Sequence, residues 1–205
     1  MSLNGRPERL VLASSNLGKL ADFRLLFAGS GITIELPEDH GVSLDVEETG
    51  QTFLDNARLK ARASVVATGL ASLADDSGII AYALGEEPGV ISARYAGLEC
   101  DDHANNLKLI ARLAGHEDRR AAFVCSLVLA WPDGDELCSE GRCEGRVIDQ
   151  ERGDNGFGYD AVFYRDDLQR TFGEVSAEEK NARSHRAAAV RELLPLLSCK
   201  QGRAG

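Results

Sequence analysis

Short apolar runs alternate along the chain with segments in which apolar residues recur at helical spacing. The runs predict strands at residues 9–13, 32–34, 120–131, 136–143, 145–148 and 161–164. The helical spacing predicts helices at residues 19–28, 52–68 and 102–114, and one from 178 to about 197. A turn at 132–135 joins two of the strands into a hairpin. This order of elements predicts an α/β fold with a mixed sheet.

The segment Ala74-Asp75-Asp76-Ser77-Gly78 lies between two apolar runs, at 70–74 and 79–84. The pattern predicts two adjacent carboxylates at a strand end, followed by a glycine turn. Carboxylate oxygens are the ligands that magnesium prefers, so the pair is a candidate metal site. The alternative is an ordinary turn, because Asp, Ser and Gly all favour turns.

A polar loop, Ser14-Ser15-Asn16-Leu17-Gly18, follows the first predicted strand and precedes the first helix. In this arrangement the backbone N–H groups at the helix N-terminus point at a bound phosphate. Hydroxyl and amide groups of the loop, with the Lys19 ammonium, would add donors. The loop is not a Walker A motif, because Ala and Leu occupy positions 13 and 20. The alternative is an ordinary helix N-cap with a solvated lysine.

The helix predicted at 52–68 begins with a capping signal and ends at a glycine. Asn56 and Lys60 are four residues apart, on the same side of this helix as Phe53. Lys60 is therefore a candidate phosphate ligand, although a solvated lysine is the more common case. Glu47 and Glu48 precede the helix. They are candidate metal ligands, or acids favoured near a helix N-terminus.

Two later segments are candidates for binding a planar base. Residues 153–160 are rich in glycine, with Phe157 and Tyr159 between the glycines, which allows a base to approach and stack. The same pattern fits a bent strand that packs its aromatic residues in the core. Lys180, His185 and Arg186 form a positive cluster at the start of the last helix. Such a flank is often only solvated, but cations at a helix N-terminus oppose its dipole.

The composition is that of a globular protein of one domain or two lobes, with 205 residues, 43% hydrophobic and 27% charged. The net charge of −10 disfavours binding to a nucleic-acid backbone. Five scattered cysteines, an odd number, argue against a disulfide framework or a zinc site and suit a reducing compartment. The first nine residues lack the apolar core of a signal peptide, and no apolar run is long enough to cross a membrane. We therefore expect a cytoplasmic protein that binds neither nucleic acid nor membrane.

Six segments together resemble the Ham1/RdgB-type inosine triphosphate pyrophosphatase family. Each is a weak signal alone, but six in the same order are highly specific. The resemblance extends from Leu10 to Leu197, nearly the whole chain. The segments are residues 13–19, 47–61, 74–78, 88–94, 156–160 and 178–186.

The resemblance implies an elongated mixed β-sheet flanked by helices, in two lobes with a central cleft. The chain would be a single domain over residues 1–205, with a core at about 9–197 and frayed termini. It also implies a homodimer that hydrolyses non-canonical purine nucleoside triphosphates, namely ITP, dITP and XTP, to the monophosphate and pyrophosphate. Mg²⁺ would be the cofactor, activating a water that attacks the α-phosphate.

The resemblance also assigns roles to individual residues. Asp76 corresponds to the family's metal ligand and proposed general base. Asp75, Glu47 and Glu48 are the other acidic positions near the metal, and which glutamate faces it stays open. The positions implied to bind substrate are Ser14, Ser15, Asn16, Leu17, Gly18 and Lys19 around the triphosphate, Lys60 at a phosphate, Ser77 at the substrate, and Phe157, Gly158, Tyr159, Asp160, Lys180, His185 and Arg186 around the base.

Two alternatives belong to other classes. One is a Maf-type nucleotide pyrophosphatase with a different base preference. The other is a non-catalytic module that binds a nucleotide without cleaving it. A panel of nucleotides, assayed with and without magnesium, discriminates among the three.

Overall fold

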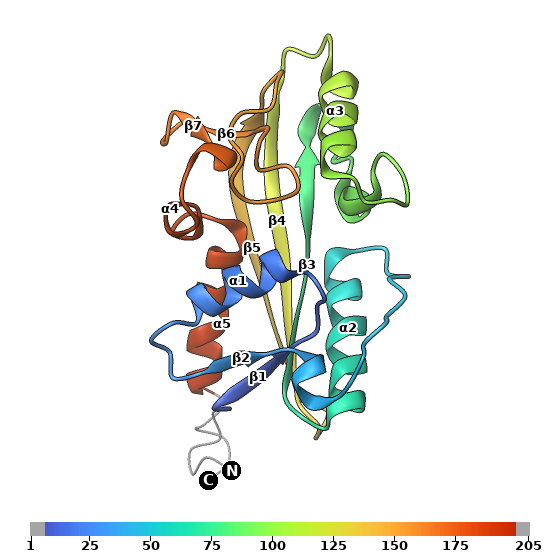
Figure 1. Cartoon of the computed structure of the whole chain (residues 1–205), viewed down its shortest axis with the longest axis vertical. Coiled ribbons are helices and arrows are strands. Elements are labelled where there is room, and N and C mark those ends of the chain that lie inside the picture. The colour runs from blue at the N-terminus through green and yellow to red at the C-terminus, as the bar shows by residue number, and fades with distance from the viewer. Residues whose placement is uncertain (1–6, 200–205) are drawn as a thin grey trace. The chain divides into compact units, whose positions relative to one another are not determined.

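The computed structural model describes residues 7–199, so the chain ends that we expect to be frayed lie outside the described part. Figure 1 shows the order of the elements. The strands are β1 (Arg9–Leu12), β2 (Thr33–Glu35), β3 (Ser72–Ala81), β4 (Arg120–Ala130), β5 (Glu136–Val147), β6 (Phe163–Arg165) and β7 (Arg170–Thr171). The helices are α1 (Leu17–Leu26), α2 (Phe53–Thr68), α3 (Asp102–Leu113), α4 (Ala177–Asn181) and α5 (His185–Cys199). No helix within residues 7–199 is long and apolar enough to cross a membrane.

The strands form one mixed sheet in the order β2-β1-β3-β4-β5-β6-β7. Strand β1 pairs in parallel with both β2 and β3. At the other edge, β6 pairs antiparallel with β5 and with β7. The predicted α/β class with a mixed sheet flanked by helices is confirmed.

The chain divides into two compact units. The first unit contains the residues up to Asp76, residues 125–141 and the residues from Arg186 onward. The second contains residues 77–124 and 142–185. The boundaries fall within β3, β4 and β5 and at the start of α5. The cleft expected between two lobes stays a prediction.

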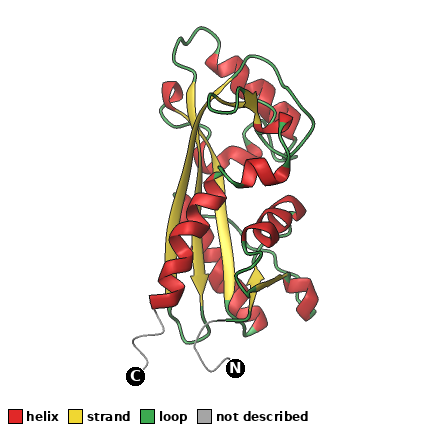
Figure 2. Ribbon diagram, turned by 90° about the vertical axis from the view of Figure 1, so that its left-hand side faces the viewer, coloured by secondary structure: helices red, strands yellow, loops and turns green. Residues whose placement is uncertain are grey.

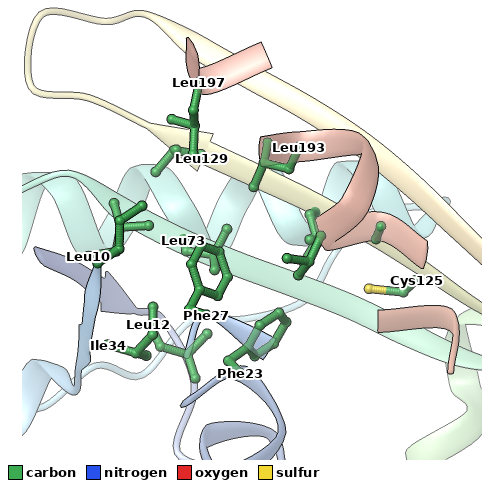
Figure 3. Packing of buried hydrophobic residues seen from close by; sticks show 14 of the residues in the cluster. Leu10, Leu12, Phe23, Phe27, Ile34, Leu73, Cys125, Leu129, Leu193 and Leu197 are labelled. Atoms are coloured by element: carbon green, nitrogen blue, oxygen red, sulfur yellow. The ribbon is translucent and has the colours of Figure 1, made fainter. Parts of the chain in front are cut away.

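Helices cover both faces of the sheet in the first unit. On one face, which we call the α1/α5 face, Phe23 of α1 and Phe27, which caps α1, meet Leu193 of α5 and Leu73 of β3 (Figure 3). Helix α5 lies along the strands on this face (Figure 2). On the other face, the α2 face, Ala57 and Ala61 of α2 pack against Ala74 and two residues of β4. Small side chains on the α2 face let the helix lie close to the sheet.

The second unit has a core of its own. It is built around aromatic residues, among them Phe123, Phe163 and Phe172, whose rings contact one another at centroid distances of 4.5–6.3 Å. Leu109 and Leu113 of α3 pack into the same cluster. Helix α3 begins at the cap residue Asp101, whose side chain accepts a hydrogen bond from the backbone N–H of Ala104.

The most consequential correction concerns residues 75–78. We expected a strand end and a turn, but these residues lie in the middle of the ten-residue strand β3. The turn preference of Asp, Ser and Gly is overridden because both carboxylates are compensated by cations from other elements, as described below. Gly78 has a different role from the expected one: a Cβ atom there would collide with Ser92. Glycine in this strand therefore allows close approach of a neighbouring segment.

Smaller corrections concern the strands of the second unit. Residues 145–148 are not a separate strand, because β5 continues without a break to Val147. The strand predicted at 161–164 is displaced to Phe163–Arg165. Residues 161–162 form a turn after the glycine-rich loop, so the strand begins only at Phe163. Strand β7 has two residues and no apolar run of its own, so it gave no signal in the sequence.

The single helix predicted from residue 178 is two helices. Helix α4 ends at Asn181, and α5 begins at His185. The buried apolar residues at helical spacing start only at Ala187, so hydrophobic packing stabilises α5 but does not extend it back through residues 182–184. The positive cluster is therefore divided, with Lys180 in the last turn of α4 and Arg186 in the first turn of α5.

Candidate active site

Strand β3 directs its two adjacent aspartates to opposite faces of the sheet. Successive side chains of a strand alternate between the faces. Leu73 packs in the cluster of the α1/α5 face and Ala74 in that of the α2 face. Asp75 accordingly meets residues of α1 and α5, whereas Asp76 meets residues of α2.

Asp75 is fully buried and contacts two cations. Its Oδ1 is 3.0 Å from Nζ of Lys19, and its Oδ2 accepts a hydrogen bond from Nε of Arg186 at 3.3 Å. Nη1 of Arg186 is also 3.2 Å from Oδ2 of Asp22 on α1. Burial alone would raise the pKa of Asp75, but the charges of Lys19 and Arg186 outweigh it and hold the pKa below its usual range. Asp75 is therefore ionised and holds two cations in place.

Lys19 is positioned by the N-terminus of α1. The Asn16 side chain caps this helix by accepting a hydrogen bond from the Lys19 backbone N–H at 3.0 Å. The Ser14 hydroxyl accepts one from the Asn16 backbone N–H. The loop is thus a helix cap, while Lys19 is not a solvated lysine, because its side chain is only 15% exposed. Ser15 and Leu17 are exposed, and Gly18 is half-buried.

Asp76 lies in a second charged group, on the α2 face. Its Oδ1 accepts a hydrogen bond from Nζ of Lys60 at 2.8 Å, and its Oδ2 accepts one from Nδ2 of Asn56 at 3.2 Å. Nζ of Lys60 also lies 2.8 Å from Oε1 of Glu48. Burial raises the pKa of Asp76, and Lys60 offsets this only in part. The carboxylates raise the pKa of Lys60 against the opposite effect of its own burial, so the lysine stays charged.

These contacts separate the two candidate glutamates. Glu48 meets Lys60 next to Asp76, whereas Glu47 is exposed. The Lys60 ammonium lies against one oxygen of Asp76 and one of Glu48, so this carboxylate pair already shares a cation. Within residues 7–199, no three His, Cys, Asp or Glu side chains converge as a metal cluster. Two carboxylates nevertheless fit Mg²⁺, which is usually bound by one or two of them together with waters and phosphates.

In the second unit, three of the residues predicted to surround the base contact one another: Lys180, Asp160 and Phe157. Nζ of Lys180 is 2.5 Å from Oδ2 of Asp160 and lies 4.7 Å from the ring centroid of Phe157. The same Asp160 oxygen accepts a hydrogen bond from the Phe157 backbone N–H at 3.0 Å. Lys180 and Asp160 are buried, and the Phe157 ring is half-buried. A cavity of about 360 Å³ lies beside this loop, lined by Phe157, Gly158, Asp160 and residues of α3, including Asn106.

The other residues predicted at the base or at the substrate have different contacts. The His185 ring stacks on Phe123 in the core of the second unit, with centroids 4.8 Å apart. Tyr159 is buried, and its hydroxyl donates a hydrogen bond to the Ser92 carbonyl at 2.8 Å. Arg186 is engaged by Asp75 and Asp22 in the first unit. Ser77 follows Asp76 on β3 and is half-buried.

Two residues of the charged groups were not among our predicted site residues. Asn56 was noted only for sharing a helix side with Lys60, and Asp22 not at all. Both have a spacing signal, because Asn56 is four residues before Lys60 and Asp22 is three after Lys19. Residues at these spacings project from the same side of a helix and often act together.

The fold and these groups define an α/β protein with lysines held by buried carboxylates, as suits a site that takes a phosphorylated ligand and a divalent cation. The model of the Ham1 family matches residues 10–196, and the chain belongs to that family. A dITP/XTP pyrophosphatase of Ralstonia nicotianae is 48% identical over 194 residues, covering 92% of this chain and 96% of the relative. One of Streptomyces avermitilis is 46% identical over 193 residues, with the same coverage. The solved structure of a HAM1 protein from Coxiella burnetii superposes with a TM-score of 0.84 at 41% identity, covering 93% of this chain and 98% of that one.

Proposed function

We propose that this chain hydrolyses non-canonical purine nucleoside triphosphates, such as dITP, ITP and XTP, to the monophosphate and pyrophosphate. Its membership of the Ham1 family and the names of its relatives support this reaction. The observation in the structure that carries the proposal is the pair of lysines, Lys19 and Lys60, held by the adjacent carboxylates of β3. Both cations are in place for a polyanionic substrate, which needs positioning and charge neutralisation more than covalent chemistry.

The triphosphate would bind through groups of the first unit. The N-terminus of α1 offers backbone N–H groups and a positive dipole end. When the triphosphate binds, Lys19 and Lys60 would each move from a carboxylate to a phosphate. The positive charge of each lysine would therefore stay neutralised. Cleavage between the α- and β-phosphates leaves pyrophosphate, a strongly anionic leaving group that these lysines would stabilise.

Asp76 and Glu48 are the residues that we propose hold Mg²⁺. Bound there, Mg²⁺ would neutralise phosphate charge and lower the pKa of a water. The fit rests on the two carboxylate oxygens that now share the Lys60 ammonium. Asp76 is also the group that we propose takes the proton of the attacking water, because burial raises its pKa. Asp75 is less suited to a metal, since its two oxygens lie on Lys19 and Arg186.

Base selection would use groups of the second unit. Hypoxanthine and xanthine carry an acceptor oxygen at C6, where adenine carries a donor amino group. Lys180, which now pairs with Asp160, and backbone N–H groups of the glycine-rich loop would donate to this oxygen, whereas in adenine they would face another donor. A site of this kind discriminates by roughly 10⁴-fold or more. The Phe157 ring offers a surface for stacking, and the base roles of His185 and Arg186 rest on the family resemblance alone.

A panel of nucleotides tests the proposal. Pyrophosphate release is measured from ITP, dITP, XTP, GTP and ATP, with Mg²⁺ and with excess chelator. We expect release from ITP, dITP and XTP but not from ATP, and only with Mg²⁺; the rate with GTP shows whether the 2-amino group of guanine is also rejected. Equal rates for ITP and ATP would refute the base site, and full activity with chelator would refute the metal requirement.

The same panel tests the two alternatives. A Maf-type preference would appear as release from other nucleotides but not from ITP, and the match to the Ham1 family disfavours it. A non-catalytic module would bind ITP without releasing pyrophosphate. The contact of Lys60 with Asp76 and Glu48 disfavours that outcome, because a module that only binds needs no buried general base beside its phosphate ligand.

We also propose that the enzyme is a homodimer in the cytoplasm. The family resemblance supports the dimer, and light scattering that gives the mass of one chain would contradict it. Four free cysteines in the described part of the chain, Cys100, Cys125, Cys138 and Cys143, suit a reducing compartment.

A further inference from the structure

We propose that Asn56 is a positioning residue, whose amide fixes Asp76 and the Glu48 loop relative to each other. This inference rests on the proposed pyrophosphatase function, in which Asp76 and Glu48 act together. Asn56 itself would touch neither substrate nor metal. Its role would be to hold the two carboxylates at the spacing at which they share one cation.

Both polar atoms of the Asn56 side chain are used, and they face different segments. Nδ2 donates a hydrogen bond to Oδ2 of Asp76 on β3, at 3.2 Å. Oδ1 accepts one from the backbone N–H of Gly50 at 2.7 Å. The side chain is fully buried, so water does not substitute for either partner. One amide thus ties the strand that carries Asp76 to the loop that carries Glu48.

The packing around Gly50 leaves little freedom at this link. A Cβ atom at Gly50 would lie 2.6 Å from Oδ1 of Asn56 and 2.7 Å from Cβ of Asp55. Only a glycine lets the loop approach the amide this closely. Lys60, one helical turn after Asn56, then meets oxygens of both Glu48 and Asp76. Helix α2 therefore supplies the neutral link and the shared cation from one side.

The chemistry of the amide suits this position better than that of other polar side chains. An aspartate at position 56 would accept from Gly50 but repel Asp76. A lysine would pair with Asp76 but offer the Gly50 N–H no acceptor. An amide satisfies both groups without charge, because it has a donor and an acceptor. It holds Oδ2 of Asp76 and leaves the other oxygen toward Lys60.

A second buried link on the same helix provides a matched control. Ser64 is fully buried on α2, and its hydroxyl donates to the Ser72 hydroxyl of β3 at 2.9 Å. Like Asn56 it ties α2 to β3, but the partners of its side chain and carbonyl, Ser72 and Thr68, are uncharged. Loss of the Ser64 link should reduce stability alone. Loss of the Asn56 link should also alter turnover and metal binding.

The test compares Asn56→Leu, which keeps the volume and removes the polar atoms, with Ser64→Ala. Wild type is assayed first for pyrophosphate release from ITP. An inactive wild type refutes the proposed function rather than the role of Asn56. For folded Asn56→Leu we expect kcat to fall about 30-fold with KM within about threefold, a typical effect of losing a residue that orients a metal ligand. Ser64→Ala should keep kcat within about twofold.

A readout independent of turnover is the affinity for Mn²⁺ in the presence of an α,β-methylene analogue of ITP, measured by electron paramagnetic resonance. Asn56→Leu should weaken it about tenfold, and Ser64→Ala should not. If Asn56→Leu does not fold, Gly50→Ala, whose methyl group displaces the amide, takes its place with the same directions expected. Wild-type kcat, or wild-type Mn²⁺ affinity, in the folded variant would overturn the proposal.

Discussion

Asp75 and Asp76 are neighbours on one strand, yet their surroundings differ in charge and in pKa. On the α1/α5 face, Asp75 and Asp22 surround Lys19 and Arg186, so two negative charges meet two positive ones. On the α2 face, Asp76 and Glu48 share Lys60, so two negative charges meet one. Of the cations in these contacts, Asp75 meets two, Lys19 and Arg186, and Asp76 meets one, Lys60.

We propose that this difference separates a supporting role of Asp75 from a chemical role of Asp76. Asp75 already contacts two cations, and its lowered pKa reflects that its charge is compensated despite burial. The pKa of Asp76 is raised because burial outweighs the effect of Lys60, so a bound cation or a proton would be favoured there. Strand alternation alone divides the two roles, because consecutive residues face opposite layers of the fold. Adjacent carboxylates in a sequence therefore need not share one ion.

The largest expected effect is on turnover in Asp76→Asn. The amide is a poor base and a weak metal ligand, so kcat for ITP should fall by about 10³-fold or more. The free energy of unfolding should change by less than about 1 kcal/mol, because burial of this carboxylate is itself unfavourable. Steady-state kinetics and urea unfolding measure the two quantities. Near-normal turnover would remove Asp76 from the centre of the site.

The next effect is on stability in Asp75→Asn. The change leaves Lys19 and Arg186 without their common carboxylate in a buried place. Removing one partner of a buried ion pair is costly, and we expect the free energy of unfolding to fall by about 3 kcal/mol. Urea unfolding of Asp75→Asn and of Asp76→Asn, under the same conditions, measures the two losses of stability that are compared. If the two variants lose equal stability, the contrast between the faces is wrong.

A smaller effect is expected for Asp22→Asn. Arg186 would keep Asp75 and lose only its second carboxylate, so the loss should be about 1–2 kcal/mol. Asp45→Asn is the matched control, because Asp45 is an exposed acid of the same unit. Both variants remove one negative charge, so a general charge effect would appear equally in each. Equal stabilities of the two variants would show that Asp22 does not hold Arg186.

Local patterns in the sequence predicted several elements and contacts around the two aspartates. Helix α2 begins after Thr52 and ends at Gly69, as its capping signals indicate. The four-residue spacing of Asn56 and Lys60 placed both on one side, where both contact Asp76. Strand β1 and helix α1 followed from an apolar run and from helical spacing. In each case the pattern that made the prediction spans only a few residues of the sequence.

Long-range compensation could not be predicted in the same way. Residues 75–78 have turn preferences but lie in a strand. The charge of Asp75 is compensated there by Arg186, which is 111 positions away in the sequence. No local pattern contains that partner. The charged residues on either side of the break between α4 and α5 also have partners far away in the sequence. Lys180 pairs with Asp160, whereas Arg186 pairs with Asp22 and Asp75. One continuous charged segment thus serves two separate groups.

The smallest effect is the pH dependence of these stabilities, and its sign distinguishes the two faces. The pKa of Asp75 is lowered on folding, from 3.8 in the unfolded chain. As the pH falls below that value, the unfolded chain takes up a proton that folded Asp75 does not, so its stabilisation is lost. The stability difference between wild type and Asp75→Asn should therefore narrow by roughly 1 kcal/mol between about pH 6 and about pH 3.

For Asp76 the sign is reversed. Its pKa is raised on folding, so the folded protein takes up the proton first and gains stability as the pH falls. The stability of wild type relative to Asp76→Asn should then increase over the same interval. Urea unfolding of the three proteins at a series of pH values gives both differences in one experiment. Two differences that change in the same direction would show that the carboxylates share one environment, despite facing opposite sides of β3.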